Sequence, residues 1–141
     1  MLCSCAAAPK TVTPKTEFLL TATAEIDGTT YTADLEFRKD GKLTAKILSP
    51  QGLAGLCYTH RNGEGALSYN GLSLPVPDNP KIKSFSAFLG ESLAAIQNGD
   101  TLTQNEDGAV YEKDGYTLYF NREGYPEKLC GRGVNAEFKI K

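Results

Sequence analysis

The sequence predicts a mainly β protein of the α+β class, with one curled antiparallel sheet and one capping helix. Three observations lead to this fold class. Apolar and polar residues alternate with period two through most of the chain, and dipeptides that end in glycine separate the alternating stretches. One stretch, Ser84–Asn98, has helical periodicity instead.

The first strands are expected at Glu17–Asp27, Thr29–Arg38 and Lys42–Ser49. In the first of them the even positions from Phe18 to Ile26 are apolar, and most odd positions are Glu or Thr. Asp-Gly dipeptides close the first two strands, and such dipeptides favour tight hairpin turns. The three strands therefore form an antiparallel meander.

The middle of the chain continues the sheet after a loop over residues 49–55. Strands are expected at Leu56–Arg61 and Ala66–Tyr69, each followed by an Asn-Gly dipeptide. Leu72–Pro77 contains prolines, which cannot donate to a strand ladder, so we expect an edge strand or a loop there.

The helix is expected at Ser84–Asn98, with Ser84 as its N-cap and Asn98-Gly99 as its stop. Gly90, in the middle, indicates close packing against a neighbour. The apolar face consists of Phe85, Phe88, Leu89, Leu93 and Ile96.

Strands resume after the helix and run to the C-terminus, again separated by dipeptides that end in glycine. They are expected at Thr101–Asn105, Ala109–Lys113, Tyr116–Asn121, Glu127–Cys130 and Asn135–Ile140.

The size of this sheet predicts its curvature. A flat sheet of about ten strands would be roughly 48 Å wide, whereas the helix is only ~22 Å long and ~10 Å across. The helix cannot cover such a sheet, so the sheet is expected to curl into a barrel or half-barrel with the helix on its open side. Its interior either keeps an apolar pocket or is filled by side chains.

Any such pocket would be lined by apolar side chains that point inward, most of which belong to the core in any case. The candidate ligand-binding residues are Phe18, Leu20, Tyr31, Leu35, Phe37, Ile47, Tyr58, Tyr69, Phe85, Phe88, Leu89 and Phe120.

The N-terminus resembles part of a bacterial lipobox, because Leu2 precedes Cys5 by three residues and a small residue stands directly before the cysteine. Ala6–Thr16 is rich in Pro, Lys and Thr, as an extended tether is. We expect residues 1–16 to be a truncated lipoprotein signal and tether, with lipid on Cys5, and residues 17–141 to be the domain. The alternative is a frayed terminus with free thiols.

Composition excludes several classes of function. The net charge is −2 and the pI about 5.4, so nucleic acid is not an expected partner. His60 is the single histidine, which excludes a site built from several histidines. No metal and no cofactor are expected, and no apolar run approaches the ~20 residues of a membrane-spanning helix.

Two further residue types bear on catalysis. Cys57 and His60 are three positions apart on one strand and therefore face opposite ways, which opposes a nucleophile pair. We expect His60 to be a histidine at the rim of the domain. Cys57 and Cys130 either form a disulfide, as exported domains allow, or remain free thiols.

Six short motifs resemble the LolA/LolB superfamily of bacterial lipoprotein carriers. They are Thr23–Asp27 (TAEID), Leu35–Gly41 (LEFRKDG), Ile47–Gly52 (ILSPQG), Tyr69–Leu72 (YNGL), Tyr116–Phe120 (YTLYF) and Gly124–Leu129 (GYPEKL). The resemblance implies an open antiparallel half-barrel that is capped by helical structure and whose concave apolar face can take acyl chains. It implies no catalytic residues.

The leading hypothesis is a monomeric extracytoplasmic lipoprotein, anchored to the bacterial cell membrane, that binds a lipid or acylated partner in the concave face of the half-barrel. It is not expected to be an enzyme. A second hypothesis is a packed β-rich interaction module on the cell surface, without a lipid ligand. The third is a hydrolase that uses His60 or Cys57.

Overall fold

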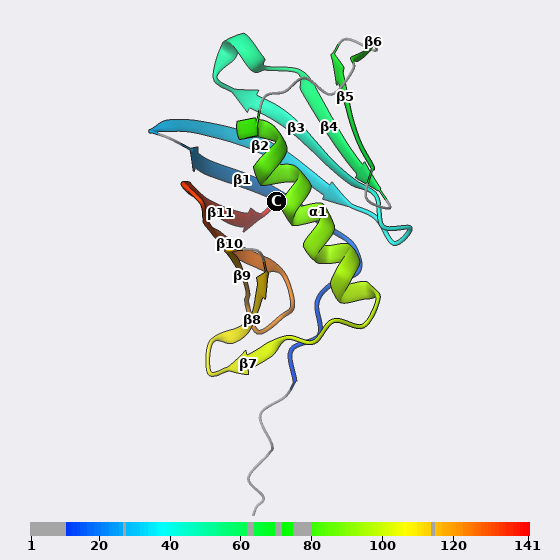
Figure 1. Cartoon of the computed structure of the whole chain (residues 1–141), viewed down its shortest axis with the longest axis vertical. Helices are drawn as coiled ribbons and strands as arrows, with labels where there is room; N and C mark the ends of the chain where they lie inside the picture. Colours follow the sequence, from blue (N-terminus) through cyan, green and yellow to red (C-terminus); the bar gives the residue numbers. More distant parts are fainter. Residues whose placement is uncertain (1–10, 27, 62–63, 70–71, 75–79, 114) are drawn as a thin grey trace, which may run out of the picture.

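The computed structural model describes residues 11–26, 28–61, 64–69, 72–74, 80–113 and 115–141. They form an eleven-stranded antiparallel sheet, one α-helix and a short 3-10 turn, Gln51–Leu53 (Figure 1). The helix is α1 (Pro80–Gln97). The strands are β1 (Phe18–Ile26), β2 (Thr29–Phe37), β3 (Leu43–Ser49), β4 (Leu56–Arg61), β5 (Glu64–Tyr69), β6 (Leu72–Leu74), β7 (Thr103–Asn105), β8 (Gly108–Lys113), β9 (Tyr116–Phe120), β10 (Pro126–Gly131) and β11 (Val134–Ile140).

The strand order is β6-β5-β4-β3-β2-β1-β11-β10-β9-β8-β7, so β6 and β7 form opposite edges and the sheet is not closed. Strands that follow each other in the chain are neighbours in the sheet, apart from β6 and β7. The chain passes between these two edges through α1, which lies across the sheet in Figure 1. β1 and β11 pair in the middle of the sheet, with Ala22 opposite Phe138.

The alternation of apolar and polar residues in the sequence corresponds to a buried and an exposed face of the sheet. The even positions of β1 are buried, and the odd positions are exposed or half-buried. Register pairs keep these faces together, since Phe18 lies opposite Phe37 and Leu20 opposite Leu35. From α1, the buried residues Phe88, Leu89 and Leu93 belong to the same hydrophobic core. One core therefore joins the helix to one face of the sheet.

The helix differs from the sequence prediction at its start. It begins at Pro80 and not at Ser84, because proline suits the first helical position, where no backbone N–H is needed. The predicted stop is confirmed: Gly99 has a φ of 108°, and the N–H of Asp100 donates to the carbonyl of Ala95. No helix among the described residues is long and apolar enough to cross a membrane.

Candidate ligand-binding sites

A groove of about 760 Å³ lies at the ends of β1, β2 and β11. Its apolar lining starts from Phe18 and Phe37, whose ring centroids are 5.2 Å apart because the two residues are register partners. Ile140 joins them from β11, whose end lies beside β1. Leu19 and Tyr125 complete the apolar part of the groove.

Two of these groove residues are exposed apolar side chains. Leu19 is 54% exposed and Ile140 is 56% exposed. By the alternation of their strands, Ile140 continues the core face after Phe138, whereas Leu19 belongs to the outer face. The apolar surface therefore extends around the strand ends from the inner to the outer side.

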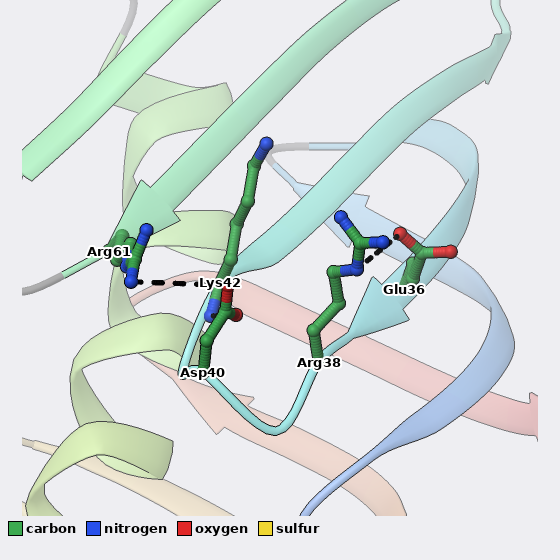
Figure 2. Close-up of polar contacts among 5 residues, drawn as sticks. All are labelled: Glu36, Arg38, Asp40, Lys42 and Arg61. Atoms are coloured by element: carbon green, nitrogen blue, oxygen red, sulfur yellow. Dashed lines mark hydrogen bonds and ion pairs between the residues drawn. The ribbon is translucent and has the colours of Figure 1, made fainter.

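Charged side chains of both signs surround the groove. The Arg38 Nε lies 3.8 Å from the Glu36 Oε1, and the Arg61 Nη2 lies 3.9 Å from the Asp40 Oδ2. Figure 2 draws both ion pairs. Glu36, Arg38 and Asp40 line the groove, together with Lys141. Exposed ion pairs of this kind contribute roughly 0–1 kcal/mol, so a ligand can take over these partners at little cost.

A second pocket, of about 400 Å³, lies between β4, α1 and the end of β8. His60 and Ser92 line it, and both are at most 2% exposed. The Nε2 of His60 and the Oγ of Ser92 are buried and have no hydrogen-bond partner among the residues that the structure describes. The expectation of a rim histidine is therefore wrong: His60 points inward from β4 and is covered by α1.

Gly90 explains how the helix comes so close to His60. A Cβ at this glycine would lie 2.6 Å from the Cγ and 3.0 Å from the Cβ of His60, and closer still to its Nδ1. The sequence prediction that Gly90 marks close packing is confirmed.

The helix also contacts the other half of the sheet, on the same face. There Phe88 stacks on Tyr116 of β9, with ring centroids 4.0 Å apart. In a flat sheet β4 and β9, six spacings apart in the strand order, would be about 29 Å from each other. A helix is only ~10 Å across. Residues two positions apart on α1, Phe88 and Gly90, therefore contact strands from both halves of the sheet.

Burial sets the protonation behaviour near the second pocket. It lowers the pKa of His60 below its usual 6.5, and the nearby Glu91 carboxylate opposes this shift in part. Burial also raises the pKa of Tyr58, with Glu91 acting in the same direction. His60 is therefore a neutral imidazole at pH 7.

The lowered pKa predicts a loss of stability in mild acid. As the pH is lowered below about 6.5, the unfolded chain binds a proton at this histidine before the folded protein does. The free energy of unfolding therefore decreases as the pH decreases, by at most about 1.4 kcal/mol per pH unit. Urea unfolding between pH 7.5 and 5.5 measures the slope. His60→Gln should flatten it and Glu91→Gln should lower the His60 pKa further; identical slopes in all three proteins would contradict the prediction.

The sequence-predicted ligand-binding residues fall into three groups. Phe18 and Phe37 line the groove and Phe88 lines the second pocket. Tyr31 is half-buried, Tyr69 is 41% exposed, and the side chain of Phe85 lies outside the described residues. The remaining residues are buried in the core, and they are Leu20, Leu35, Ile47, Tyr58, Leu89 and Phe120.

Sequence reasoning missed several lining residues, and two of them carried a signal in the sequence. Leu19 is an apolar residue at a position where the alternation of β1 calls for a polar one. Ser92 is a polar residue on the apolar face of the helix, four positions after Phe88. Tyr125 follows a turn and has no periodic signal.

The disulfide alternative for Cys57 and Cys130 is wrong. The two residues are free thiols on β4 and β10, which four other strands separate. Both lie on the outer face, since the neighbouring buried residues alternate with them, and a disulfide needs Cα atoms within about 7 Å. His60 lies on the opposite face from Cys57, as expected. Cys5 lies outside the described residues.

The described part of the predicted tether packs against the domain. Val12 is buried, its N–H donates to the Gln104 Oε1 over 2.8 Å, and the N–H of Lys15 donates to the Gly124 carbonyl. The Lys15 ammonium lies 5.4 Å from the ring centre of Tyr125. The N-terminal segment is thus attached beside the groove.

Comparisons with known proteins assign no family. No protein-family model matches the chain, and no curated protein does. Among solved structures, an uncharacterized conserved protein from Thermus thermophilus has 13% sequence identity and a TM-score of 0.45, over 88% of this chain and 79% of that chain. The likeness is too weak to carry an argument, and the LolA/LolB resemblance stays a prediction.

Proposed function

We propose that this protein binds an amphipathic lipid or an acylated partner, with the apolar chain in the groove at the mouth of a half-barrel that α1 caps. One observation carries the proposal: exposed Leu19 and Ile140 stand beside the Phe18–Phe37 ring pair in one groove that is bordered by both signs of charge. An acyl chain would remove this apolar surface from water, at about 0.8 kcal/mol for each buried methylene.

The half-barrel is supported by the two contacts of α1. The helix reaches β4 through Gly90 and β9 through Phe88, although five strands separate these two strands. A sheet bent this far has a concave side that faces the helix, and the groove opens where strands β1, β2 and β11 end.

The charges around the groove suit the polar end of such a ligand. Arg38, Lys39 and Lys141 can bind a phosphate, while Glu17 and Glu36 can bind an ammonium group. A zwitterionic phospholipid would therefore find a side chain of opposite sign for each of its two charges at the border of the groove.

The anchoring part of the proposal rests on the lipobox-like residues Leu2–Cys5. In this proposal the lipid on Cys5 holds the protein at the outer side of a bacterial cell membrane. Lys15 docks on the domain beside Tyr125 of the groove, and the ten residues from Cys5 to Lys15 span at most about 35 Å. The groove would thus stay close to the membrane surface.

A titration with a phospholipid that carries a fluorescent acyl chain tests the binding. Ile140→Asp places a charge in the apolar groove and should weaken binding at least tenfold, which corresponds to about 1.4 kcal/mol. Leu48→Asp is the matched control, because Leu48 is 42% exposed on β3 and does not line the groove. The affinity of the Leu48→Asp variant for the lipid should equal that of the unchanged protein. Equal affinities for all three proteins would refute lipid binding in the groove.

A packed interaction module remains the second candidate, because Leu20, Leu35 and Leu89 are fully buried and fill the interior where they lie. In that case the same titration would show no saturable lipid binding by the unchanged protein.

A further inference from the structure

We propose that residues 12–15 form a strap whose docking on the domain is coupled to occupation of the lipid groove. The strap is the part of the N-terminal segment just before β1, and it leads directly into Glu17 and Phe18 of the groove lining. Its role rests on the proposed lipid binding, since it concerns the regulation of that same site. A docked strap favours a bound ligand, and a bound ligand favours the docked strap.

The first attachment of the strap is at the edge strand β7. The side-chain amide of Gln104 pairs with both backbone groups of Val12. Its Oε1 accepts from the Val12 N–H over 2.8 Å, and its Nε2 donates to the Val12 carbonyl over 3.4 Å. The side chain of Val12 is buried and belongs to the hydrophobic core. Figure 1 shows the N-terminal segment passing β7 on its way to β1.

The second attachment is at the turn between β9 and β10. The N–H of Lys15 donates to the Gly124 carbonyl over 2.8 Å. The strap lies so close to this turn that a Cβ at Gly124 would be 3.1 Å from the carbonyl carbon of Thr13, and closer still to its oxygen. The glycine therefore leaves the room that the backbone of the strap occupies.

Tyr125 connects this second attachment with the groove. Its N–H donates to the Asn121 Oδ1 over 3.0 Å, and its carbonyl accepts from the Asn121 N–H over 2.9 Å, so the turn holds its backbone in place. The ring of Tyr125 lines the groove, and the Lys15 ammonium lies 5.4 Å from the ring centre. Release of the strap removes this cation and loosens the backbone that enters the groove at Glu17. The wall of the groove therefore depends on whether the strap is docked.

The strap can open while the domain stays folded. Among its four residues, all of which the structure describes, Val12 is the one with a buried side chain, and Thr13 and Lys15 are exposed. Segments with few buried side chains and few hydrogen bonds open locally at a much lower free energy than the whole domain. Coupling between such an opening and a binding site is reciprocal and typically changes an affinity by roughly 5–150-fold.

Hydrogen exchange of the Val12 and Lys15 amides in the full-length protein reports the docking of the strap. The probe ligand is dodecylphosphocholine below its micelle concentration, because it has one apolar chain and both charges of a zwitterionic phospholipid. Saturating probe should slow the exchange of both amides about fivefold or more, since the docked strap hydrogen-bonds both N–H groups. Unchanged exchange although the probe binds would overturn the coupling and leave lipid binding in the groove intact.

Two strap variants test the coupling in the other direction. Neither Gln104 nor Val12 lines the groove, yet Gln104→Ala and Val12→Ser both weaken the first attachment and should each lower the affinity for the probe about fivefold or more. Thr103→Ala, at an exposed position of the same strand, is the control and should change nothing. Equal affinities in all these variants would contradict the coupling. No binding of the probe by the unchanged protein would refute the proposed function and the coupling with it.

Discussion

Phe88→Ala should lower the free energy of unfolding by about 3–5 kcal/mol, the usual cost of removing a buried phenyl ring. Phe88 is buried in the common core and stacks on Tyr116, so the variant loses both the apolar burial and the ring contact. It also removes the contact between α1 and the β9 side of the sheet. Urea unfolding followed by circular dichroism measures the change.

Tyr119→Ala provides the control for this prediction. Tyr119 lies on β9 like Tyr116, but its ring is exposed on the outer face. Its removal should cost less than about 1 kcal/mol. If the Phe88 variant lost no more stability than the Tyr119 variant, the helix would not be packed on this side of the sheet.

Gly90→Val should destabilise the protein by about 3 kcal/mol, at the upper end of the cost of overpacking. Any Cβ at this position would overlap the His60 ring, and a β-branched side chain adds two further atoms. The Cβ of His60 itself lies 3.0 Å from this position, and the pairing of β4 with β3 and β5 holds its backbone, so rotation of the ring alone does not relieve the overlap. The same unfolding measurement applies.

A double-mutant cycle identifies the cause of this loss. Combined with His60→Ala, the Gly90 substitution should cost at least about 1 kcal/mol less than it does alone. Gln97→Val, at an exposed position of the same helix, should cost only a few tenths of a kcal/mol through helix propensity. Strict additivity in the cycle would contradict the close approach of α1 to His60.

Much of the fold follows from the sequence because alternation and turn dipeptides are local signals. The predicted strand Thr29–Arg38 is β2 to within one residue, as is the final strand. The helix start was wrong because Pro80 lies before the apolar periodicity begins, and periodicity was the signal used. The sequence left Leu72–Pro77 open between an edge strand and a loop because its prolines cannot donate to a strand ladder, and the structure has the short edge strand β6 there.

The candidate sites were harder to predict, since they depend on contacts between distant segments. Alternation shows that Tyr58 and Leu35 point inward, but not whether they line a cavity or fill the core. The pocket at His60 arises from the crossing of α1 over β4, which no local pattern encodes. The sequence left the Cys57–Cys130 disulfide and the free thiols both open for the same reason, because strand order decides the separation of the two residues.

One mass-spectrometric measurement decides whether the protein carries a lipid. The full-length protein is isolated from the cells in which it is made and extracted with organic solvent, which releases non-covalent lipid but not a covalent anchor. We predict phospholipid or another acylated molecule in near-equimolar amount with the unchanged protein and with Leu48→Asp, and a marked loss with Ile140→Asp. The absence of lipid from the unchanged protein, or equal amounts in all three, would contradict lipid binding in the groove.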